Sequence, residues 1–463
     1  MSTLVERCRE LVAEIVAGRR CILATGPVAG MAGTVKLLRE LGATDFLLLA
    51  DSQGTGAAPE PPVEAYIVGR ESSDMMTGIR NHAAGLRDLP PEAAAAVERF
   101  DPDRTACVFV SFVIDVSEIA GRPVYAPRLP EWLPLEDKSV IDAVWDDLGV
   151  ARAPSRVVAA NAAALGEAAA QLDPTGEGTV WSGDSREGFN GGASYVRWVR
   201  TAEHAREASD FFSAHCDRVR VAPFLEGIPC SIHGLVFAGG EVATFRPCEM
   251  VVLRRTRQAE FLYAGASTFW DPPAADREAL RELARRVGAG LHARVGYRGP
   301  FTIGGVLTAN GFRPTELNAR FGAAMGLLGR GLTELPLFLL TERIKRGDPT
   351  VDPEALERRL VENADNNRGG GGWTIVPGAR TETEVHDIVY EDGRYRLAAE
   401  GEAASGTLTL GPASAGTWVR FSPDPAQLPE GEPVAPRVVA AFALAEAEFG
   451  CPFGPLEAAR EMC

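Results

Sequence analysis

The sequence has very little lysine and no excess of positive charge. Of its 47 basic residues, all but Lys36, Lys138 and Lys345 are arginines, and 63 acidic residues give a formal net charge of −16. Binding to the backbone of nucleic acids or to anionic membranes requires clustered positive charge. The composition therefore disfavours nucleic acid and membranes as partners, although it is compatible with a local cationic pocket for phosphate.

Paired cysteines and long apolar runs are also missing. The eight cysteines are scattered without a Cys-x-x-Cys pair, which disfavours a zinc knuckle. No apolar run is long enough to span a bilayer, and no basic and apolar leader opens the chain. We therefore expect a reduced, cytoplasmic protein in which most cysteines are small core residues.

The chain is long enough for several domains. Its 463 residues exceed the size of one hydrophobic core, and 46% apolar residues suffice for packed globular units. Residues 21–42 predict a strand, a glycine-rich turn and a helix, and residues 45–50 and 106–116 predict further buried strands. The glycines do not have the G-x-G-x-x-G spacing, so a tight turn is favoured over a dinucleotide site.

The rest of the chain predicts two further regions. Residues 179–199 predict a strand, a glycine-rich loop and a strand, and residues 301–318 predict a hairpin with its turn at Asn310-Gly311. The stretch "DNNRGGGGW" (365–373) predicts a flexible linker. Beyond it, a small α/β unit ends in a helix near residues 434–449.

One strand-like stretch carries three polar side chains at alternate positions. In "RPTELNARFG" (313–322) these are Glu316, Asn318 and Arg320, and alternate side chains of a strand share one face. A carboxylate beside an amide oxygen suits Mg²⁺, which prefers oxygen ligands and keeps waters and phosphate oxygens. An arginine beyond them suits a phosphate or carboxylate. The ordinary alternative for such residues is a solvated strand edge.

Two further features are typical of a phosphate site. Backbone N–H groups of a glycine-rich loop such as "REGFNGGASY" (186–195) can bind phosphates. Lys138 stands at the start of a predicted helix, where anions are favoured. A plain turn and a surface charge are the usual interpretations of each feature alone. Their order along the chain is what favours a nucleotide–magnesium site.

In this order the motifs resemble those of the ATP-grasp superfamily of carboxylate–amine ligases. The resemblance covers about residues 131–345, from Lys138 and the helix end "LGV" (148–150), through the hinge "PFLEG" (223–227), to the E-x-N-x-R motif. Among its subgroups, the chain resembles the actinobacterial peptide ligases of the pheganomycin-ligase type.

The resemblance implies an α/β (α+β) fold of three parts. Residues 1–130 would form a Rossmann-like pre-ATP-grasp domain, residues 131–365 the ATP-grasp domain with the nucleotide and metal site, and residues 366–463 a small α/β C-terminal domain. It also implies ATP and Mg²⁺ as cofactors, with small-molecule carboxylate and amine substrates.

The resemblance assigns roles to individual residues. Lys138 would bind the α- and β-phosphates, Glu316 and Asn318 the magnesium ion, and Arg320 the γ-phosphate or acyl phosphate. Residues 221–225 would line the adenine slot, and the glycine loop would close over the phosphates. The loop and hinge residues implied in ATP binding are Arg186, Gly188, Gly191, Gly192, Pro223, Phe224, Leu225 and Glu226.

Three positions depart from the family pattern. Ser182 stands in place of a second lysine, Pro229 in place of an acid for the ribose, and Gly304 in place of a further metal-binding acid. Arg186 is the candidate to replace the second lysine, Glu226 the ribose acid, and Glu249 the further metal-binding acid. For Glu249, a strand-face ion pair with Arg246 or Arg254 is an equal alternative.

Other polar residues have open assignments. Arg246 and Arg254 are candidates for binding a substrate carboxylate, and Arg255 is a third; a surface position is favoured for at least one of them. His233 is interpreted as a hydrogen-bonded strand residue rather than a catalytic base. No Ser-His-Asp or Cys-His signature supports a hydrolase.

These features together predict an ATP-dependent carboxylate–amine ligase. It would form an amide or peptide bond on an amino-acid or peptide substrate, through an acyl phosphate and with release of ADP and phosphate. We expect a homodimer that acts in natural-product biosynthesis. The alternative is a diverged nucleotide-binding protein without ligase turnover, which the departures at Ser182 and Gly304 favour. A third possibility is an acyl phosphate passed to an acceptor other than an amine.

Overall fold

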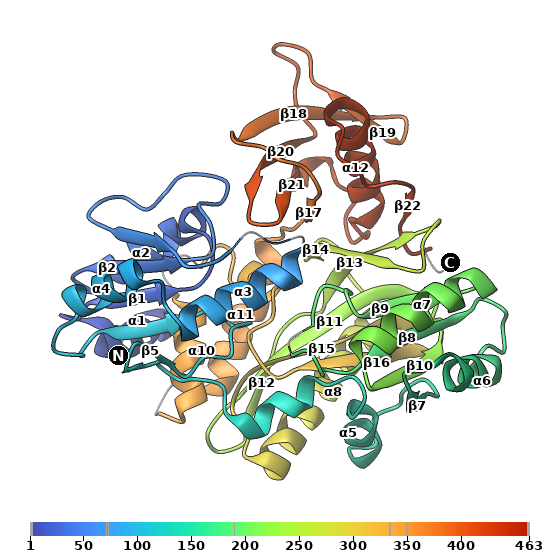
Figure 1. Ribbon diagram of the computed structural model, residues 1–463, viewed down its shortest axis with the longest axis horizontal. Helices are drawn as coiled ribbons and strands as arrows, with labels where there is room; N and C mark the ends of the chain where they lie inside the picture. Colours follow the sequence, from blue (N-terminus) through green and yellow to red (C-terminus); the bar gives the residue numbers. More distant parts are fainter. Residues whose placement is uncertain are drawn as a thin grey trace.

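The structure is a computed structural model that describes residues 3–70, 72, 74–188, 190–332, 335–348 and 351–460. Figure 1 shows an N-terminal α/β unit in blue, a central region of antiparallel strands in green and yellow, and a C-terminal sheet in orange and red. The chain is therefore of the mixed α/β class that its sequence predicts.

The N-terminal unit has a parallel sheet of order β3-β2-β1-β4. Its strands are β1 (Cys21–Ala24), β2 (Phe46–Ala50), β3 (Glu64–Ile67) and β4 (Cys107–Val110). Helices α1 (Leu4–Val16) and α2 (Ala32–Glu40) pack on one face, and α3 (Met75–Arg87) and α4 (Pro91–Phe100) on the other. Apolar runs such as residues 46–50 are fully buried because both faces of the sheet are covered. The short ribbon of β5 (Glu118–Ile119) and β6 (Arg122–Pro123) follows.

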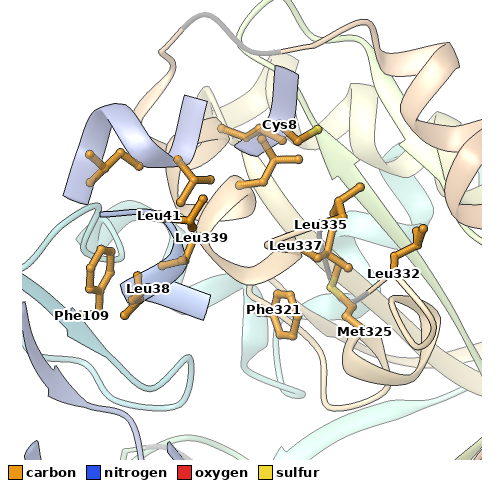
Figure 2. Close-up of a cluster of buried hydrophobic side chains, with 14 of the residues drawn as sticks. Cys8, Leu38, Leu41, Phe109, Phe321, Met325, Leu332, Leu335, Leu337 and Leu339 are labelled. Carbon is orange, nitrogen blue, oxygen red and sulfur yellow. The ribbon is translucent and has the colours of Figure 1, made fainter. Parts of the chain in front are cut away.

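The core of this unit continues into helices that come much later in the chain. Figure 2 shows Cys8 and Leu38 in one apolar cluster with Leu337 and Leu339 of α10 (Leu337–Arg346). Arg343 of the same helix donates a hydrogen bond to the Leu11 carbonyl at 2.6 Å. The short helix α9 (Met325–Leu328) and α11 (Pro353–Asn366) join this cluster. The parallel sheet is therefore held in place by the segment that follows the E-x-N-x-R motif.

The first central sheet is antiparallel, with the order β7-β10-β8-β9. It consists of β7 (Arg156–Ala159), β8 (Thr179–Gly183), β9 (Val196–Val199) and β10 (Arg218–Pro223). Helices α6 (Ala162–Leu172) and α7 (Ala202–His215) cover one face, where Trp181, Val219 and Val221 are buried. The alternate positions of the strands point to the opposite face.

The second central sheet has the order β14-β13-β11-β15-β16. Its strands are β11 (Ile228–Val236), β13 (Cys248–Arg255), β14 (Phe261–Ser267), β15 (Gly299–Thr308) and β16 (Gly311–Asn318), with β12 (Val242–Thr244) beside β11. Helices α5 (Ile141–Asp147) and α8 (Ala274–Val295) pack against β11 and β15. The predicted turn joins β15 to β16, where Gly311 has the positive φ of +88° that a tight hairpin requires.

The C-terminal region is a five-stranded antiparallel sheet of order β17-β21-β20-β18-β19. Its strands are β17 (Gly372–Val376), β18 (Glu384–Glu391), β19 (Arg394–Leu397), β20 (Gly406–Ala413) and β21 (Gly416–Pro423). Helix α12 (Ala435–Phe449), at the predicted position, shares its core with Val251 and Leu253 of β13, and the short strand β22 (Leu456–Glu457) also pairs with β13. This sheet is therefore anchored on the second central sheet.

The predicted flexible linker is instead a closely packed connection. The Thr268 N–H donates to the Gly369 carbonyl at 2.8 Å, and the Gly369 N–H donates back to the Thr268 hydroxyl at 2.8 Å. A Cβ at Gly370 would lie 2.6 Å from the Ala266 carbonyl oxygen, and one at Gly371 would lie 2.2 Å from that of Phe421. The glycines thus allow close approach of two backbones, which is a second use of glycine besides flexibility.

The cysteines agree with the expectation that most of them are small core residues. The seven cysteines that the structure describes are all buried and free of disulfides. Among the described helices, none combines the length and the apolar composition that crossing a bilayer demands.

Glu249 links the C-terminal region to β13. Its two carboxylate oxygens accept hydrogen bonds from the backbone N–H groups of Val434 and Ala435, at 2.7 and 2.9 Å, at the start of α12. Burial raises the pKa of Glu249 to about 7, although the two N–H groups act in the opposite direction. The carboxylate thus serves as a helix cap between two regions.

We expect Glu249→Ala to lower the free energy of unfolding by about 1–3 kcal/mol, because two buried N–H groups lose their acceptor. The pKa of about 7 in the folded state exceeds the ordinary value of about 4.3. The folded state therefore binds more protons between these pH values, and stability falls as the pH rises through this window. Glu249→Gln removes this dependence of stability on pH. The free energy of unfolding of the variant, relative to that of the wild type, should therefore increase from about pH 5 to about pH 8. Urea unfolding of the three proteins at both pH values measures this, and a constant difference would contradict it.

Candidate functional site

A cavity of about 830 Å³ lies where the three regions meet. Its walls come from the open face of the first central sheet, from strands of the second, from α3 and the ends of β1, β2 and β4, and from β17 and β21. Its volume is in the range of small-molecule sites in proteins, about 300–1,000 Å³. The carboxyl ends of parallel strands, which the N-terminal unit contributes, are a common place for ligands.

The E-x-N-x-R motif lies in the wall of this cavity. Glu316 pairs across the hairpin with Gly304 and Asn318 with Thr302, and both side chains line the cavity, as does Arg320 just beyond the strand. The Asn318 amide donates to Glu316 Oε1 at 3.4 Å and accepts from Arg320 Nη2 at 2.9 Å. The period of two thus places the three groups together, as the sequence predicts.

Lys138 joins this group from a distant part of the chain. Its Nζ lies 3.5 Å from Glu316 Oε2, and its side chain is largely buried. It is located between the 3₁₀ helix at Pro130–Glu136 and α5, which begins at Ile141, so it precedes the helix at whose start the sequence predicts it. Glu136 at the end of the 3₁₀ helix pairs with Arg320 at 3.1 Å. The same short segment therefore positions both the lysine and the arginine of the predicted site.

The donor set fits a magnesium ion that is held jointly with phosphates. Glu316 supplies a carboxylate and Asn318 an amide oxygen to the cavity wall, and the Asn318 oxygen here accepts a hydrogen bond from Arg320. Within the described ranges, no cluster of three or more His, Cys, Asp or Glu side chains could hold a metal. Two protein oxygens do not complete an octahedral site, whereas Mg²⁺ commonly keeps waters and phosphate oxygens as its other ligands.

Gly304 lies directly opposite Glu316 on the neighbouring strand. A Cβ at this position would lie 2.9 Å from both Cγ and Oε1 of Glu316. An acidic side chain here would therefore force Glu316 to move. The absence of a second acid is thus coupled to the present position of Glu316.

Glu249 does not fill this gap. Met250 and Val252 of the same strand line the cavity, but the Glu249 side chain points to the other face of the sheet, where it caps α12. The reason is the period of two along β13. The expected metal role for Glu249 is thus incompatible with its position.

Only part of the glycine loop lines the cavity. Gly191 and Gly192 line the cavity, whereas Gly188 and Arg186 do not. Arg186 instead pairs with Asp217 at 3.1 Å, close to the end of α7. The expectation that Arg186 replaces the missing lysine is therefore not supported. The Gly191 N–H contacts the Met76 sulfur at 3.1 Å, so α3 lies against the loop.

Arg220 is a cavity residue that the sequence reasoning missed. It lies on β10 directly opposite Ser182 on β8, and both line the cavity. Its Nε donates to both oxygens of Asp142, at 3.0 and 2.8 Å, and within the described chain its two Nη groups have no hydrogen-bond partner. The signal in the sequence is the alternation of Arg220 with the core residues Val219 and Val221. This alternation places the guanidinium on the open face.

The hinge residues line one end of the cavity. Pro223, Phe224 and Leu225 face it, while Val221 is buried in the core on the opposite side of the sheet. The Phe224 ring stacks on Trp198 with 4.3 Å between the centroids. The result is a flat aromatic and aliphatic wall.

Arg254 lies at this hinge and not beside the E-x-N-x-R motif. Its guanidinium is 5.0 Å from the centroid of the Phe224 ring and forms a bidentate ion pair with Glu226. Burial raises the pKa of Glu226, but the hydrogen bonds and charge of Arg254, together with the backbone N–H groups of Arg460 and Gly227, outweigh it, so the pKa lies below its ordinary value. Arg254 lines the cavity, whereas Glu226 does not. Glu226 is thus engaged by Arg254 rather than presented to a ribose.

Arg246 lies outside the cavity. It is fully buried, donates to the Trp270 carbonyl at 2.8 Å, and pairs with Asp271 and with Asp365 near the end of α11. These partners belong to the connection between the central and C-terminal regions. Arg246 therefore has a structural position, and the expected contact with a substrate carboxylate is not available to it.

His233 is a hydrogen-bonded strand residue, as interpreted from the sequence. Its ring nitrogens lie 2.8 Å from the Thr302 hydroxyl and 3.1 Å from the Ser231 hydroxyl. Burial lowers its pKa to about 3, so the ring is neutral at physiological pH.

No protein-family model matches the chain, and no curated protein matches its sequence. Several solved structures are similar to it in fold. The biotin carboxylase of Campylobacter jejuni has 12% identity and a TM-score of 0.52, with 95% of this chain and 92% of that chain covered.

Two further structures show the same likeness. The biotin carboxylase domain of the Hydrogenobacter thermophilus 2-oxoglutarate carboxylase has 12% identity and a TM-score of 0.51, with 88% and 86% covered. Pyruvate carboxylase of Rhizobium etli has 16% identity and a TM-score of 0.51, with 88% of this chain and 36% of that chain covered. These enzymes and the arrangement of the two central sheets show that the chain has the ATP-grasp fold.

Proposed function

We propose that the protein is an ATP-dependent carboxylate–amine ligase acting on an amino-acid or peptide substrate. The observation that carries this proposal is the convergence of Lys138, Glu316, Asn318 and Arg320 on one wall of a large cavity in an ATP-grasp fold. The Hydrogenobacter thermophilus domain, which is similar in fold, was solved in complex with MgADP and bicarbonate, and this supports a nucleotide and an anionic substrate for this chain.

The cavity offers separate surroundings for the two ends of ATP. The wall of Phe224, Leu225 and Val306 suits the flat apolar adenine ring. Lys138, the backbone of Gly191 and Gly192, and Arg220 suit the phosphates. In this proposal Arg220 supplies the positive charge that a second lysine at Ser182 would give, because the two positions are directly opposite on paired strands.

Glu316 and Asn318 would hold Mg²⁺ through their side-chain oxygens. When bound, the ion would neutralise phosphate charge and orient the phosphates. Arg320 lies next to Asn318 and is held by Glu136. Its guanidinium would therefore stabilise the charge that develops on the transferred phosphoryl group.

The proposed reaction proceeds in two steps. A carboxylate oxygen of the first substrate attacks the γ-phosphorus of ATP, the bond to the bridging oxygen breaks, and ADP leaves with the electron pair. The nitrogen of the amine substrate then attacks the acyl carbon, the carbon–oxygen bond to phosphate breaks, and the amine loses one proton. The products are the amide, ADP and phosphate.

An acyl phosphate must be protected from water, and two contacts between regions lie at the border of the cavity. Helix α3 touches the glycine loop through Met76 and Gly191. The end of β20 touches the N-terminal unit, where the Thr55 hydroxyl donates to the Pro412 carbonyl at 2.8 Å. Excluding water in this way protects reactive intermediates.

The proposal also covers the location, the oligomeric state and the biosynthetic role of the protein. Composition and resemblance support a cytoplasmic homodimer in natural-product biosynthesis, of the pheganomycin-ligase type. A nucleotide-binding protein without turnover is the second candidate, and Gly304 and Ser182 favour it because each lacks a group that the family uses. Substrate-dependent ADP release from magnesium-ATP distinguishes the two.

Glu316→Gln is expected to lower substrate-dependent ADP release about 100-fold or more, because a neutral amide replaces the metal-binding carboxylate. It should also weaken the binding of Mg·ATP while leaving the binding of metal-free ATP much less affected. Glu278→Gln, at an exposed position of α8, is the matched control. Equal Mg·ATP affinity in the wild type and Glu316→Gln, with an unchanged thermal midpoint, would refute the metal role.

Arg220→Met is expected to raise the KM for ATP about 10-fold or more, because a charge-assisted contact to phosphate is lost. Adding Ser182→Lys to this variant should recover part of the affinity, since a lysine there reaches the same space from the opposite strand. A merely structural role for Arg220 would lower the thermal midpoint, and Ser182→Lys would not restore ATP binding. Steady-state kinetics and melting curves of both variants separate these outcomes.

A further inference from the structure

One face of the C-terminal sheet is turned toward the cavity and carries three large apolar side chains and one arginine, Arg420. Trp373 and Ile375 of β17 and Trp418 of β21 line the cavity, with Ile375 directly opposite Trp418 in the strand register. Their sequence neighbours, such as Val376 and Val419, are buried against α12. The sheet thus has a core face and a second face that is only partly covered. Large apolar side chains on such a face indicate a binding surface.

Helix α3 supplies further apolar side chains to the same cavity. Met75, Met76 and Ile79 line it at the start of this helix. The helix also lies close to the turn between β20 and β21, since a Cβ at Gly78 would lie 3.5 Å from the Ser414 hydroxyl. The helix and the C-terminal sheet are therefore adjacent walls of one space.

Contacts with the rest of the molecule hold the apolar face at the cavity. A Cβ at Gly265 of β14 would lie 3.1 Å from Cδ1 of Trp373, so this ring packs directly on the second central sheet. The Thr55 hydroxyl holds the Pro412 carbonyl at 2.8 Å at the other end of the hairpin. A preformed apolar wall binds its ligand without the cost of ordering loops.

Most of the charged groups of the cavity are concentrated elsewhere. Lys138, Glu316 and Arg320 belong to the proposed phosphate and metal site, and Arg254 is paired at the hinge. Arg420 is the exception, because it lines the cavity directly opposite Trp373, is exposed to solvent, and has its guanidinium 6.0 Å from the centroid of the Trp418 ring. A cationic side chain placed between α3 and β17–β21 would lose hydration and face the positive charge of Arg420, and an anionic one would meet only this solvent-exposed guanidinium.

From these observations we infer that α3 and the β17–β21 face form the subsite for a bulky apolar side chain of the substrate. The inference rests on the proposed ligase function and adds the substrate class, an amino acid or peptide with an aromatic or branched aliphatic side chain. The residues that line this subsite are Met75, Met76, Ile79, Trp373, Ile375 and Trp418.

The test begins with the full-length protein, magnesium-ATP and all pairs of the common L-amino acids, with ADP release as the readout. Each pair that stimulates ADP release is expected to contain at least one bulky apolar member, such as leucine or phenylalanine. Stimulation confined to pairs of small or charged amino acids overturns the inference while it supports the ligase. Calorimetric titration of L-phenylalanine and L-leucine into the Mg·ADP-bound protein is the second measurement.

Trp418→Ala tests the subsite directly. We expect a rise of about 10-fold or more in the KM or Kd for the apolar substrate, because a large apolar contact is lost, with the KM for ATP changed less than about twofold. Val385→Ala, which truncates an exposed apolar residue of the same sheet, is the matched control. Unchanged substrate affinity in Trp418→Ala overturns the inference.

Two negative results of these measurements lead to different conclusions. Binding of Mg·ATP without any binding or turnover of apolar amino acids overturns the subsite and leaves the nucleotide site in place. Absence of Mg·ATP binding overturns the proposed function and the subsite together.

Discussion

The pairing of β15 with β16 is the constraint on which the candidate site depends. This hairpin fixes Glu316 and Asn318 on the face of the sheet that lines the cavity. A slip of one residue would turn both side chains into the core on the other face. The turn at Gly311 and the core residues Ile303 and Leu317, which pair with each other, set this register. The contacts to Lys138 and Arg320 exist because the register is correct.

The two units at the ends of the chain are built onto this central sheet by different means. The N-terminal unit shares an apolar cluster with α10, so its packing is like that within a single domain. The C-terminal sheet is attached through the core between β13 and α12 and through buried polar groups such as Glu249 and Arg246. Such buried polar groups are costly unless paired, so they fix one arrangement of the regions. The cavity between the three regions is a result of both attachments.

Several polar residues that suggest chemistry in the sequence serve structure instead. Arg186 pairs with Asp217, Arg246 with Asp271, and Glu249 with a helix start. In a chain whose basic residues are nearly all arginines, most of these side chains form ion pairs because the guanidinium has five donors to satisfy. Only a position in the cavity wall distinguishes residues such as Arg220 and Arg254 from the others.

The sequence by itself determined the local elements and the order of the motifs. Alternation along residues 311–318 and the turn at Asn310-Gly311 specify a hairpin, and a strand's period of two specifies which side chains share a face. Each central sheet has two faces, and the face that lines the cavity is the one against which no helix packs. Contacts between distant segments of the chain decide where the helices pack. The tertiary structure therefore decided that Lys138 meets Glu316, that Glu249 faces α12, and that Arg220 lies opposite Ser182. It also decided that the glycines at 369–372 form a closely packed connection. Glycine is typical of flexible segments, but it is equally typical of places where two backbones approach closely.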